Sequence, residues 1–402
     1  MNPAQGRLHT HIASLRSSAI RDVANAAMGR EDVLAFWFGE SDEVTPDVVR
    51  QAAIESLQKG ETFYAHNLGL PALRDSIALY TRQLHPQAQD IGEKRVAVTS
   101  GGVSALMLAM QAVLGAGDEC LVITPIWPNL VAQPQILGAQ VKTFSLHPNQ
   151  GLWQLDLQAL LSAITPQTRL LVVNSPNNPS GWTLTRDEQV AILNRCRQTG
   201  TWILADEVYE RLFYGDAACA PSFLDIAQAD DRLMVAHSFS KSFLMTGWRL
   251  GWLVVPADLT DTLGKLIEFN TSCAPVFVQR AALMALAHTQ AITPPLVRHL
   301  AACRDSLVGA LQGVPGLQAA AAPAGMYVFF KMTGHDDGIL TAKRLVTEAG
   351  LGLAPGEAFG SSSSGWLRWC FASKDLDRLQ HGAQRLRHWL AAQEAQAPAI
   401  RT

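Results

Sequence analysis

Short apolar runs alternate with longer amphipathic stretches through the middle of the chain, from about residue 95 to residue 290. Short apolar runs bounded by turn residues are typical of buried strands, and amphipathic stretches are typical of helices. Their alternation predicts an α/β fold with a largely parallel sheet. The expected strands cover residues 95–98, 169–174, 201–206, 232–237 and 250–255.

One helix is delimited by its own terminal residues. Thr185 is followed three residues later by Glu188, the spacing of a capping box, and Gly200 is suited to end the helix. After the Thr-Pro-Pro segment at residues 293–295 the pattern changes to helices alternating with shorter strands. We therefore expect a second domain to begin near that point.

The composition is that of an ordinary globular protein with a large core. Of the 402 residues, 48% are hydrophobic and 17% are charged, and a chain of this length usually divides into two domains. The formal net charge is −3 and there is no long run of Lys or Arg. Small molecules are therefore expected as partners, with no nucleic acid and no membrane.

Targeting and redox features favour the cytoplasm. Residues 1–7 lead into no apolar segment, and no window approaches the roughly 20 apolar residues of a membrane span, so neither secretion nor membrane insertion is expected. The six cysteines show no Cys-x-x-Cys spacing, which argues against a zinc site or a disulfide framework. A reducing, cytoplasmic location is the resulting prediction.

Polar residues close three of the expected strands. Asn174, Asp206 and His237 each stand at the carboxyl end of an apolar run. In open α/β sheets the ligand lies beyond the carboxyl ends of the strands. The sequence therefore predicts a binding site at this edge of the sheet.

Lys241 is the strongest candidate for chemistry. It lies in the segment Ser-Phe-Ser-Lys-Ser-Phe at residues 238–243, and Arg249 follows among glycines. A lysine among small hydroxyl residues near an arginine suits a Schiff-base nucleophile beside a phosphate site. The alternative is a solvated surface lysine followed by a connecting turn.

Two glycine- and asparagine-containing segments could contact the same ligand. The turn at residues 99–106, with Gly101 and Gly102, precedes an apolar helix and could offer free backbone N–H groups to an anion. The loop at residues 174–181 holds asparagines between prolines. Either segment can also be read as an ordinary turn.

Two further segments carry charge at the ends or in the middle of apolar runs. Asp206 could pair with a pyridinium nitrogen and Tyr209 could donate to a phenolate oxygen, although a strand-end aspartate is often only a helix cap. Arg368 lies in an otherwise apolar or aromatic segment at residues 365–371. Its guanidinium needs an anionic partner, either a substrate carboxylate or an acidic residue of the chain.

Taken in order, these segments resemble the class I/II aminotransferases, the aspartate aminotransferase-like group of fold-type I pyridoxal-phosphate enzymes. The likeness also includes residues 18–21, 38–40 and 64–74, and it runs nearly end to end.

The resemblance implies a three-layer PLP-transferase fold of the α/β class. A large PLP-binding domain at residues 46–293 would contain a mostly parallel seven-stranded sheet. A smaller α+β domain would be formed by both termini, from residues 1–45 and 294–402.

The resemblance also implies a role for each candidate residue. Lys241 would form the internal aldimine with pyridoxal 5′-phosphate and move the proton between substrate and cofactor. Asp206 would pair with the pyridine nitrogen, and Tyr209 would reach the phenolic oxygen; these three residues are the expected catalytic residues. Further cofactor contacts would come from Gly101, Gly102, Val103, Trp127, Asn178, Ser238 and Arg249, and substrate contacts from Gly39, Asn178 and Arg368.

A homodimer with shared active sites is implied through Tyr64. In the family a tyrosine at this place reaches the phosphate of the neighbouring subunit. Judged from the sequence alone, Tyr64 would instead pack against Leu68 and Leu73 of its own chain.

Departures from the family leave the substrate side chain open. Val103 stands where one subgroup has a lysine for a distal carboxylate, and residues 270–275 contain no basic residue where other members supply an arginine. Leu130 stands where some members have a histidine that contacts the ring-bound aspartate, so support for Asp206 is expected from elsewhere. Trp37 and Phe38 could line an apolar pocket or could pack between domains.

The function expected from the resemblance is transfer of an amino group from an α-amino acid to a 2-oxo acid by a ping-pong mechanism. A carbon–sulfur β-lyase on the same scaffold is one alternative, because the same cofactor chemistry can expel a leaving group from the β-carbon. A non-catalytic regulatory module is the other, although the chain shows no basic recognition helix.

Overall fold

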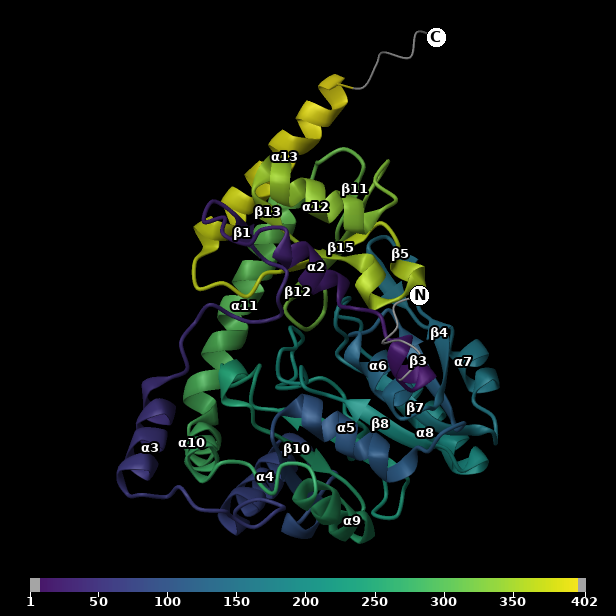
Figure 1. The fold of residues 1–402 in the computed structure, drawn as a ribbon, viewed down its shortest axis with the longest axis vertical. Helices are drawn as coiled ribbons and strands as arrows, with labels where there is room; N and C mark the ends of the chain where they lie inside the picture. Colours follow the sequence, from purple (N-terminus) through teal and green to yellow (C-terminus); the bar gives the residue numbers. More distant parts are fainter. Residues whose placement is uncertain (1–7, 397–402) are drawn as a thin grey trace.

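A seven-stranded sheet forms the core of the larger part of the molecule in the computed structural model, which describes residues 8–396; this part is the lower one in Figure 1. The residues on which the expectation about secretion depends, 1–7, lie outside the described part, as do residues 397–402. In spatial order the strands are β2 (Val96–Thr99), β10 (Gly251–Val254), β9 (Leu233–Ser238), β8 (Trp202–Asp206), β7 (Thr168–Asn174), β3 (Glu119–Thr124) and β4 (Gln140–Ser145).

The sheet is mostly parallel, and all five expected strands are present. Pairings from β9 through β8, β7 and β3 to β4 are parallel, whereas β10 is antiparallel to both β9 and β2. The expectation of a largely parallel set thus fails for residues 250–255. The connection after β9 contains only turns and a 3₁₀ helix, and it lacks the α-helix that usually makes a parallel crossover.

Helices cover both faces of the sheet, which gives three layers. Along each strand, alternate residues enter two separate cores: Leu204 packs with α5 and α9 on one face, while Ile203 and Ala205 belong to the core on the other. The helices of this part are α3 (Asp47–Gln58), α4 (Pro71–Leu84), α5 (Gly102–Val113), α6 (Asn129–Ile136), α7 (Leu157–Ala163), α8 (Arg186–Thr199), α9 (Ala257–Glu268) and α10 (Val276–Ala287).

Helix α8 begins and ends as its sequence predicts. Thr185 and Glu188 form the reciprocal capping box, and Gly200 adopts the left-handed conformation that ends the helix.

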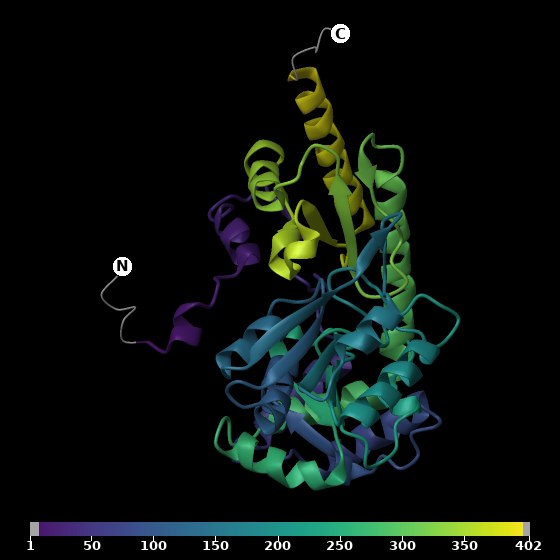
Figure 2. The ribbon, with the colours of Figure 1, turned by 90° about the vertical axis from the view of Figure 1, so that its right-hand side faces the viewer.

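Both ends of the described chain contribute to a second, smaller part. Its four-stranded antiparallel sheet has the order β11-β12-β15-β14, and β1 from the N-terminal segment pairs with β13. Figure 2 shows this part stacked on the first along the long axis, with α13 at the far end. Its elements are α2 (Ala19–Asn25), β1 (Leu34–Ala35), α11 (Thr289–Leu311), β11 (Leu317–Gln318), β12 (Tyr327–Met332), α12 (Gly338–Ala349), β13 (Leu351–Gly352), β14 (Ala354–Pro355), β15 (Trp366–Cys370) and α13 (Leu376–Gln396).

Helix α11 passes from one part to the other (Figure 1). It runs through Pro294 and Pro295, so these prolines do not interrupt the helix as the sequence pattern suggested. A proline removes one backbone hydrogen bond from a helix but does not end it when tertiary packing holds both sides, and Ile292 and Leu296 are buried on either side.

The remaining elements are short. They are α1 (Thr10–Ala13), β5 (His147–Asn149), β6 (Leu152–Gln154), η2 (Glu93–Arg95), η3 (Phe223–Asp225), η4 (Thr246–Trp248), η5 (Gly356–Phe359) and η6 (Ser361–Ser363). Between residues 8 and 396 no helix combines the length and apolar character that crossing a bilayer requires.

Candidate active site

A cavity of about 660 Å³ lies at the carboxyl edge of the large sheet and is closed by residues of the smaller part. It brings together most of the side chains predicted from the sequence. Those lining it are Gly39, Gly102, Val103, Trp127, Asn178, Asp206, Tyr209, Ser238, Lys241, Arg249 and Arg368.

The pleat of the strands selects which polar residues face the cavity. Asn174, Asp206 and Ser238 end neighbouring strands, point to the α5 side of the sheet and line the cavity. His237 precedes Ser238 and therefore points to the opposite face. Its side chain belongs to a different cluster, so only two of the three strand-end residues noted in the sequence reach the cavity.

Lys241 is held against the N-terminal segment. Its Nζ donates to the carbonyl oxygen of Gly39 at 2.6 Å. Burial lowers the pKa of Lys241 to about 8, and the positive charge of Arg368 acts in the same direction. A lysine with this pKa is partly neutral near pH 7 and can act as a nucleophile or base.

Asp206 is a buried carboxylate without a strong partner. It is 2% exposed, and its one side-chain hydrogen bond among residues 8–396 comes from the backbone N–H of Val208 at 3.4 Å. Burial raises the pKa of Asp206 to about 7, while the Val208 N–H and the charge of Lys241 act in the opposite direction. A protonated ring nitrogen would supply the cation that this carboxylate lacks.

The start of α5 forms a cradle for an anion. Gly101 precedes the helix with φ +95° and gives no side-chain cap, so the first backbone N–H groups stay available. A Cβ on Gly101 would lie 2.5 Å from Nη2 of Arg249, so the glycine leaves room for this guanidinium. Ser238 donates to Ser240 at 2.8 Å beside it.

This donor set fits the expected cofactor. A helix N-terminus, hydroxyl groups and an arginine suit a phosphate, Asp206 suits a pyridinium nitrogen, and Lys241 suits a carbonyl carbon.

Arg368 is a buried cation without an acidic partner among the described residues. It is 2% exposed, Nη1 donates to Oδ1 of Asn178 at 2.8 Å, and Nη2 donates to the carbonyl oxygen of Trp37. Its Nε has no partner there. The alternative of a structural salt bridge is therefore wrong for this arginine within residues 8–396, and the unpaired guanidinium suits a carboxylate from a ligand.

Of the two roles considered for Trp37 and Phe38, lining the pocket holds for Phe38, whereas the contact seen for Trp37 lies within the smaller part and not between the two parts. Phe38 lines the cavity, whereas the Trp37 ring is buried against Gly352, where a Cβ would come within 2.1 Å of the ring. Backbone alternation sends the neighbouring side chains in different directions.

Tyr64 does not pack against its own chain. Its side chain is 88% exposed, so the expected packing on Leu68 and Leu73 is wrong.

Among the cavity residues to which the sequence analysis gave no role are Tyr327 and Arg21. Tyr327, at the start of β12, lines the cavity, and its hydroxyl lies 2.6 Å from that of Tyr209. Arg21, from α2, lines it too and lies over the ring of Phe38, with 5.6 Å between its Cζ and the ring centroid. Arg21 stood in a segment noted only for its resemblance, and Tyr327 carried no polar signal beyond its strand pattern.

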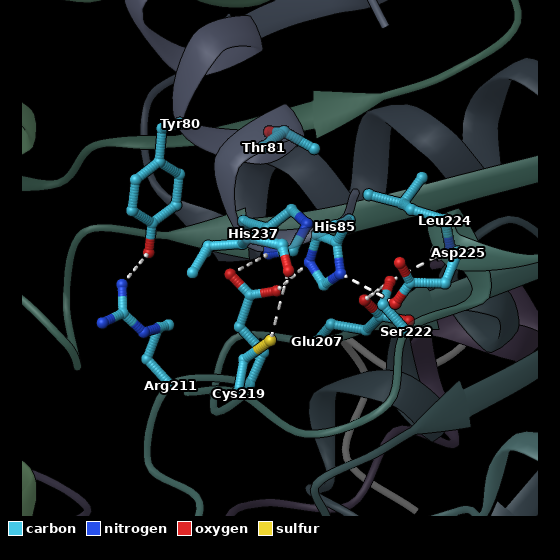
Figure 3. A network of polar contacts seen from close by, with 12 residues as sticks. Tyr80, Thr81, His85, Glu207, Arg211, Cys219, Ser222, Leu224, Asp225 and His237 are labelled. Atoms are coloured by element: carbon cyan, nitrogen blue, oxygen red, sulfur yellow. Dashed lines mark hydrogen bonds and ion pairs between the residues drawn. The ribbon is translucent and has the colours of Figure 1, made fainter. Parts of the chain in front are cut away.

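A buried polar network lies on the other face of the sheet, where Figure 3 shows His85 between two acidic side chains. Its imidazole contacts Asp225 at 3.0 Å and Glu210 at 3.1 Å. Glu207, the residue after Asp206, accepts from Ser222. The hydrogen bond of Glu207 thus holds the backbone next to Asp206 from the face opposite the cavity. No sequence motif predicted this support.

The chain matches a family model described as aminotransferase class I and II over residues 32–386. It is 35% identical over 353 residues to the arginine–pyruvate transaminase of Pseudomonas aeruginosa, with 87% of each chain covered. A probable aspartate aminotransferase of Methanocaldococcus jannaschii is 29% identical, covering 92% of this chain and 96% of that protein.

Solved structures give the same likeness. The aspartate aminotransferase of Thermotoga maritima superposes with a TM-score of 0.87 at 30% identity, covering 96% of this chain and all of the other. An aspartate aminotransferase variant of Thermus thermophilus gives a TM-score of 0.88 at 29% identity, covering 95% of this chain and 99% of the other. With 95–96% of this chain covered, the likeness includes both parts of the chain.

Proposed function

The chain belongs to the class I and II aminotransferases and is a pyridoxal-phosphate-dependent aminotransferase, and from this premise we propose that the cavity at Lys241 is its active site. The observation that carries the proposal is the meeting of Lys241, Asp206 and Arg368 in one cavity.

The proposed cofactor contacts follow the donor set of the cavity. Gly101, Gly102 and Val103 would offer backbone N–H groups to the phosphate, and Ser238 and Arg249 would complete its binding. Trp127 would lie against the ring, Asp206 would pair with its nitrogen, and Tyr209 and Asn178 would reach its phenolic oxygen. When bound, pyridoxal phosphate supplies an electron sink for the electrons released at the substrate's α-carbon.

The protein's own part in the reaction is binding and proton transfer. Arg368 would donate hydrogen bonds to the substrate α-carboxylate, with Asn178 and Gly39 beside it, and so orient the α-carbon. Lys241, whose pKa is lowered to about 8, would take the proton from that carbon and return it. An α-amino acid would give up its amino group in one half-reaction, and a 2-oxo acid would receive it in the second.

Tyr64 supports the proposal of a homodimer with shared sites. Phe63, Tyr64 and Phe269 are 84%, 88% and 89% exposed, which is unusual for large aromatic side chains. A second copy would cover them, and Tyr64 of one copy would reach the phosphate bound by the other.

At the level of the whole chain, we propose a large domain at residues 46–293 and a small one from residues 1–45 and 294–402.

The six cysteines are all free, which supports the proposal of a reducing, cytoplasmic location.

A donor screen without an acceptor tests the proposed function. Enzyme loaded with pyridoxal phosphate is mixed with each common amino acid, and 2-oxo acid and ammonia are measured. A transaminase forms one equivalent of 2-oxo acid per subunit and no ammonia, then turns over when a second 2-oxo acid is added. If no amino acid yields a 2-oxo acid, the proposal is wrong.

The same screen separates the lyase. Continuous pyruvate and ammonia production from a cysteine conjugate, with no acceptor present, would assign carbon–sulfur bond cleavage instead of amino transfer.

A further inference from the structure

Tyr327 contacts three separate parts of the active site. Its side chain is 1% exposed, and its hydroxyl lies 2.6 Å from the hydroxyl of Tyr209, with the two rings edge to face. The guanidinium of Arg368 lies over its ring, 4.4 Å from the centroid. The third contact is with Gly39, where a Cβ would come within 2.1 Å of the Tyr327 hydroxyl oxygen.

These contacts join elements that are distant in the sequence. Tyr327 begins β12, Arg368 lies on the neighbouring strand β15, and Tyr209 follows β8 of the large sheet. Gly39 belongs to the N-terminal segment, and its carbonyl oxygen receives the hydrogen bond of Lys241. One side chain therefore touches the partners proposed for the cofactor, the carboxylate and the lysine.

The hydrogen bond between the hydroxyl groups of Tyr209 and Tyr327 can run in either direction. Each tyrosine has one O–H donor, so in a bond between two hydroxyls only one of them donates to the other. If Tyr209 donated to Tyr327, its proton would be used within the protein. If Tyr327 donates, Tyr209 keeps its proton for a group in the cavity. Burial raises the pKa of Tyr327 to about 12 and that of Tyr209 well above its ordinary value, so both stay protonated at working pH.

We propose that Tyr327 is a positioning residue: its hydroxyl donates to Tyr209 and thereby directs the Tyr209 proton into the cavity, and its ring supports the guanidinium of Arg368. The inference rests on the proposed function, in which Tyr209 hydrogen-bonds the phenolic oxygen of the cofactor. When Tyr209 accepts a hydrogen bond from Tyr327, the hydrogen bond that Tyr209 donates to the cofactor becomes stronger, because hydrogen bonds in a chain polarise one another.

The hydroxyl is tested by Tyr327→Phe in the loaded enzyme. The absorbance of the bound cofactor is followed from pH 5 to pH 10. We expect the pKa of this absorbance change to rise by roughly half to one unit in the variant, because a weaker bond from Tyr209 stabilises the anionic phenolic oxygen less.

A double variant tests whether Tyr327 acts through Tyr209. Tyr209→Phe alone is expected to raise the same pKa at least as far, and adding Tyr327→Phe to it is expected to change nothing more. An additional shift in the double variant would contradict the proposed route.

The ring is tested by binding of an unreactive carboxylate, propionate, measured as a competitive inhibitor. Tyr327→Phe keeps the ring under Arg368 and is expected to leave the inhibition constant unchanged. Tyr327→Leu removes the ring and is expected to weaken inhibition about 2- to 10-fold. Unchanged inhibition in the leucine variant would overturn the role of the ring.

Tyr80→Phe is the matched control. Tyr80 is also buried, accepts a hydrogen bond from Arg211 at 3.2 Å and has that guanidinium over its ring, but it lies outside the cavity. Tyr80→Phe should leave the pKa of the cofactor absorbance change as it is in the wild type. Thermal unfolding should confirm that all variants fold.

A Tyr327→Phe enzyme whose absorbance pKa matches the wild type would overturn the inference while leaving the function intact. Failure of the wild-type protein to bind pyridoxal phosphate would instead contradict the proposed function.

Discussion

At the scale of single residues, two buried ionisable groups define the cavity. Asp206 and Arg368 are each 2% exposed, and neither has a charged partner in contact among residues 8–396. Burial of such a group is unfavourable, and a ligand of opposite charge relieves it. Under the proposed function, the site would gain binding energy from a cationic ring nitrogen at Asp206 and from a substrate carboxylate at Arg368.

Replacing Arg368 by lysine should reduce kcat/KM for amino acid donors on the order of 100-fold, mainly through KM. The lysine keeps the charge but loses the planar fork and the bonds to Asn178 and Trp37. Steady-state kinetics with several donors measure the effect.

Arg378→Lys is the matched control, because Arg378 also lies over an aromatic ring, that of Phe36 at 4.4 Å, but outside the cavity. Equal kinetic losses in the two variants would contradict the role of Arg368.

Residues with a strong local signature could be predicted from the sequence, and residues brought in by tertiary structure could not. Asp206 and Lys241 stand at the end of a strand and in a distinctive segment. Tyr327 and Arg21 reach the cavity only because the smaller part packs over the sheet edge; Tyr327 lies in no motif, and Arg21 lies in a segment noted only for its resemblance to the family. Exposure of Tyr64 likewise follows from packing, which sequence spacing does not describe.

At the scale of elements, the turn before α5 shapes the cradle in which we propose that the phosphate binds. Its backbone conformation requires a glycine at Gly101, and the space left by the missing side chain is taken by Arg249. The backbone conformation of the turn and the proposed binding of the phosphate therefore depend on the same residue, Gly101.

We expect Gly101→Ala to weaken pyridoxal phosphate binding by about tenfold or more, because the new Cβ would displace Arg249 and strain the turn. Gly117→Ala is the control: Gly117 has φ +88° but open space around it, so it suffers the backbone strain alone. Equilibrium titration of both apoenzymes gives the dissociation constants. Equal weakening in the two variants would show that the cradle is not formed as described.

The network behind β8 and β9 predicts a pH dependence of stability. Burial opposes the charged form of His85, but the hydrogen bonds that its imidazolium donates to Asp225 and Glu210 outweigh this and raise its pKa to about 10. Its stabilisation is fully present below about pH 6.5, the unfolded value, and is lost as pH rises through about 10.

His85→Gln should therefore lower the free energy of unfolding by about 3–5 kcal/mol at neutral pH, with the difference from wild type shrinking towards pH 10. Denaturant unfolding of the apoenzyme at several pH values measures this difference. A gap that stays constant from pH 6 to pH 10 would contradict the charge state assigned to His85.

Sequence signals sufficed for elements whose ends carry their own stop signals. The capping box and terminal glycine of α8 are of this kind. The reversed direction of β10 and the passage of α11 through Pro294 and Pro295 were not predictable in the same way, because both depend on packing between distant segments.

At the scale of the whole molecule, the cavity of one chain is proposed to be completed by a second copy. The exposed aromatic residues Phe63, Tyr64 and Phe269 are the surface that this copy would cover. If each active site contains residues of both chains, two different inactive variants can restore activity in a mixed dimer. If each chain holds a complete site, they cannot.

Two inactive variants should restore activity when mixed. Tyr64→Ala and Lys241→Ala would each inactivate both sites of their own homodimers. In a mixed dimer one site would carry both changes and the other neither, so unfolding and refolding an equimolar mixture should restore up to about a quarter of wild-type activity. Absence of any recovery, with mixed dimers detected by mass, would contradict the shared site.

The central claim is that Lys241 attaches the cofactor, and its most direct test is to locate the bond. The enzyme loaded with pyridoxal phosphate is reduced with borohydride, digested and analysed by mass spectrometry. The account predicts that the peptide containing Lys241 carries the pyridoxyl phosphate mass, and that Lys241→Ala carries none. Labelling of a different lysine in the wild-type protein, or no retained mass, would contradict it.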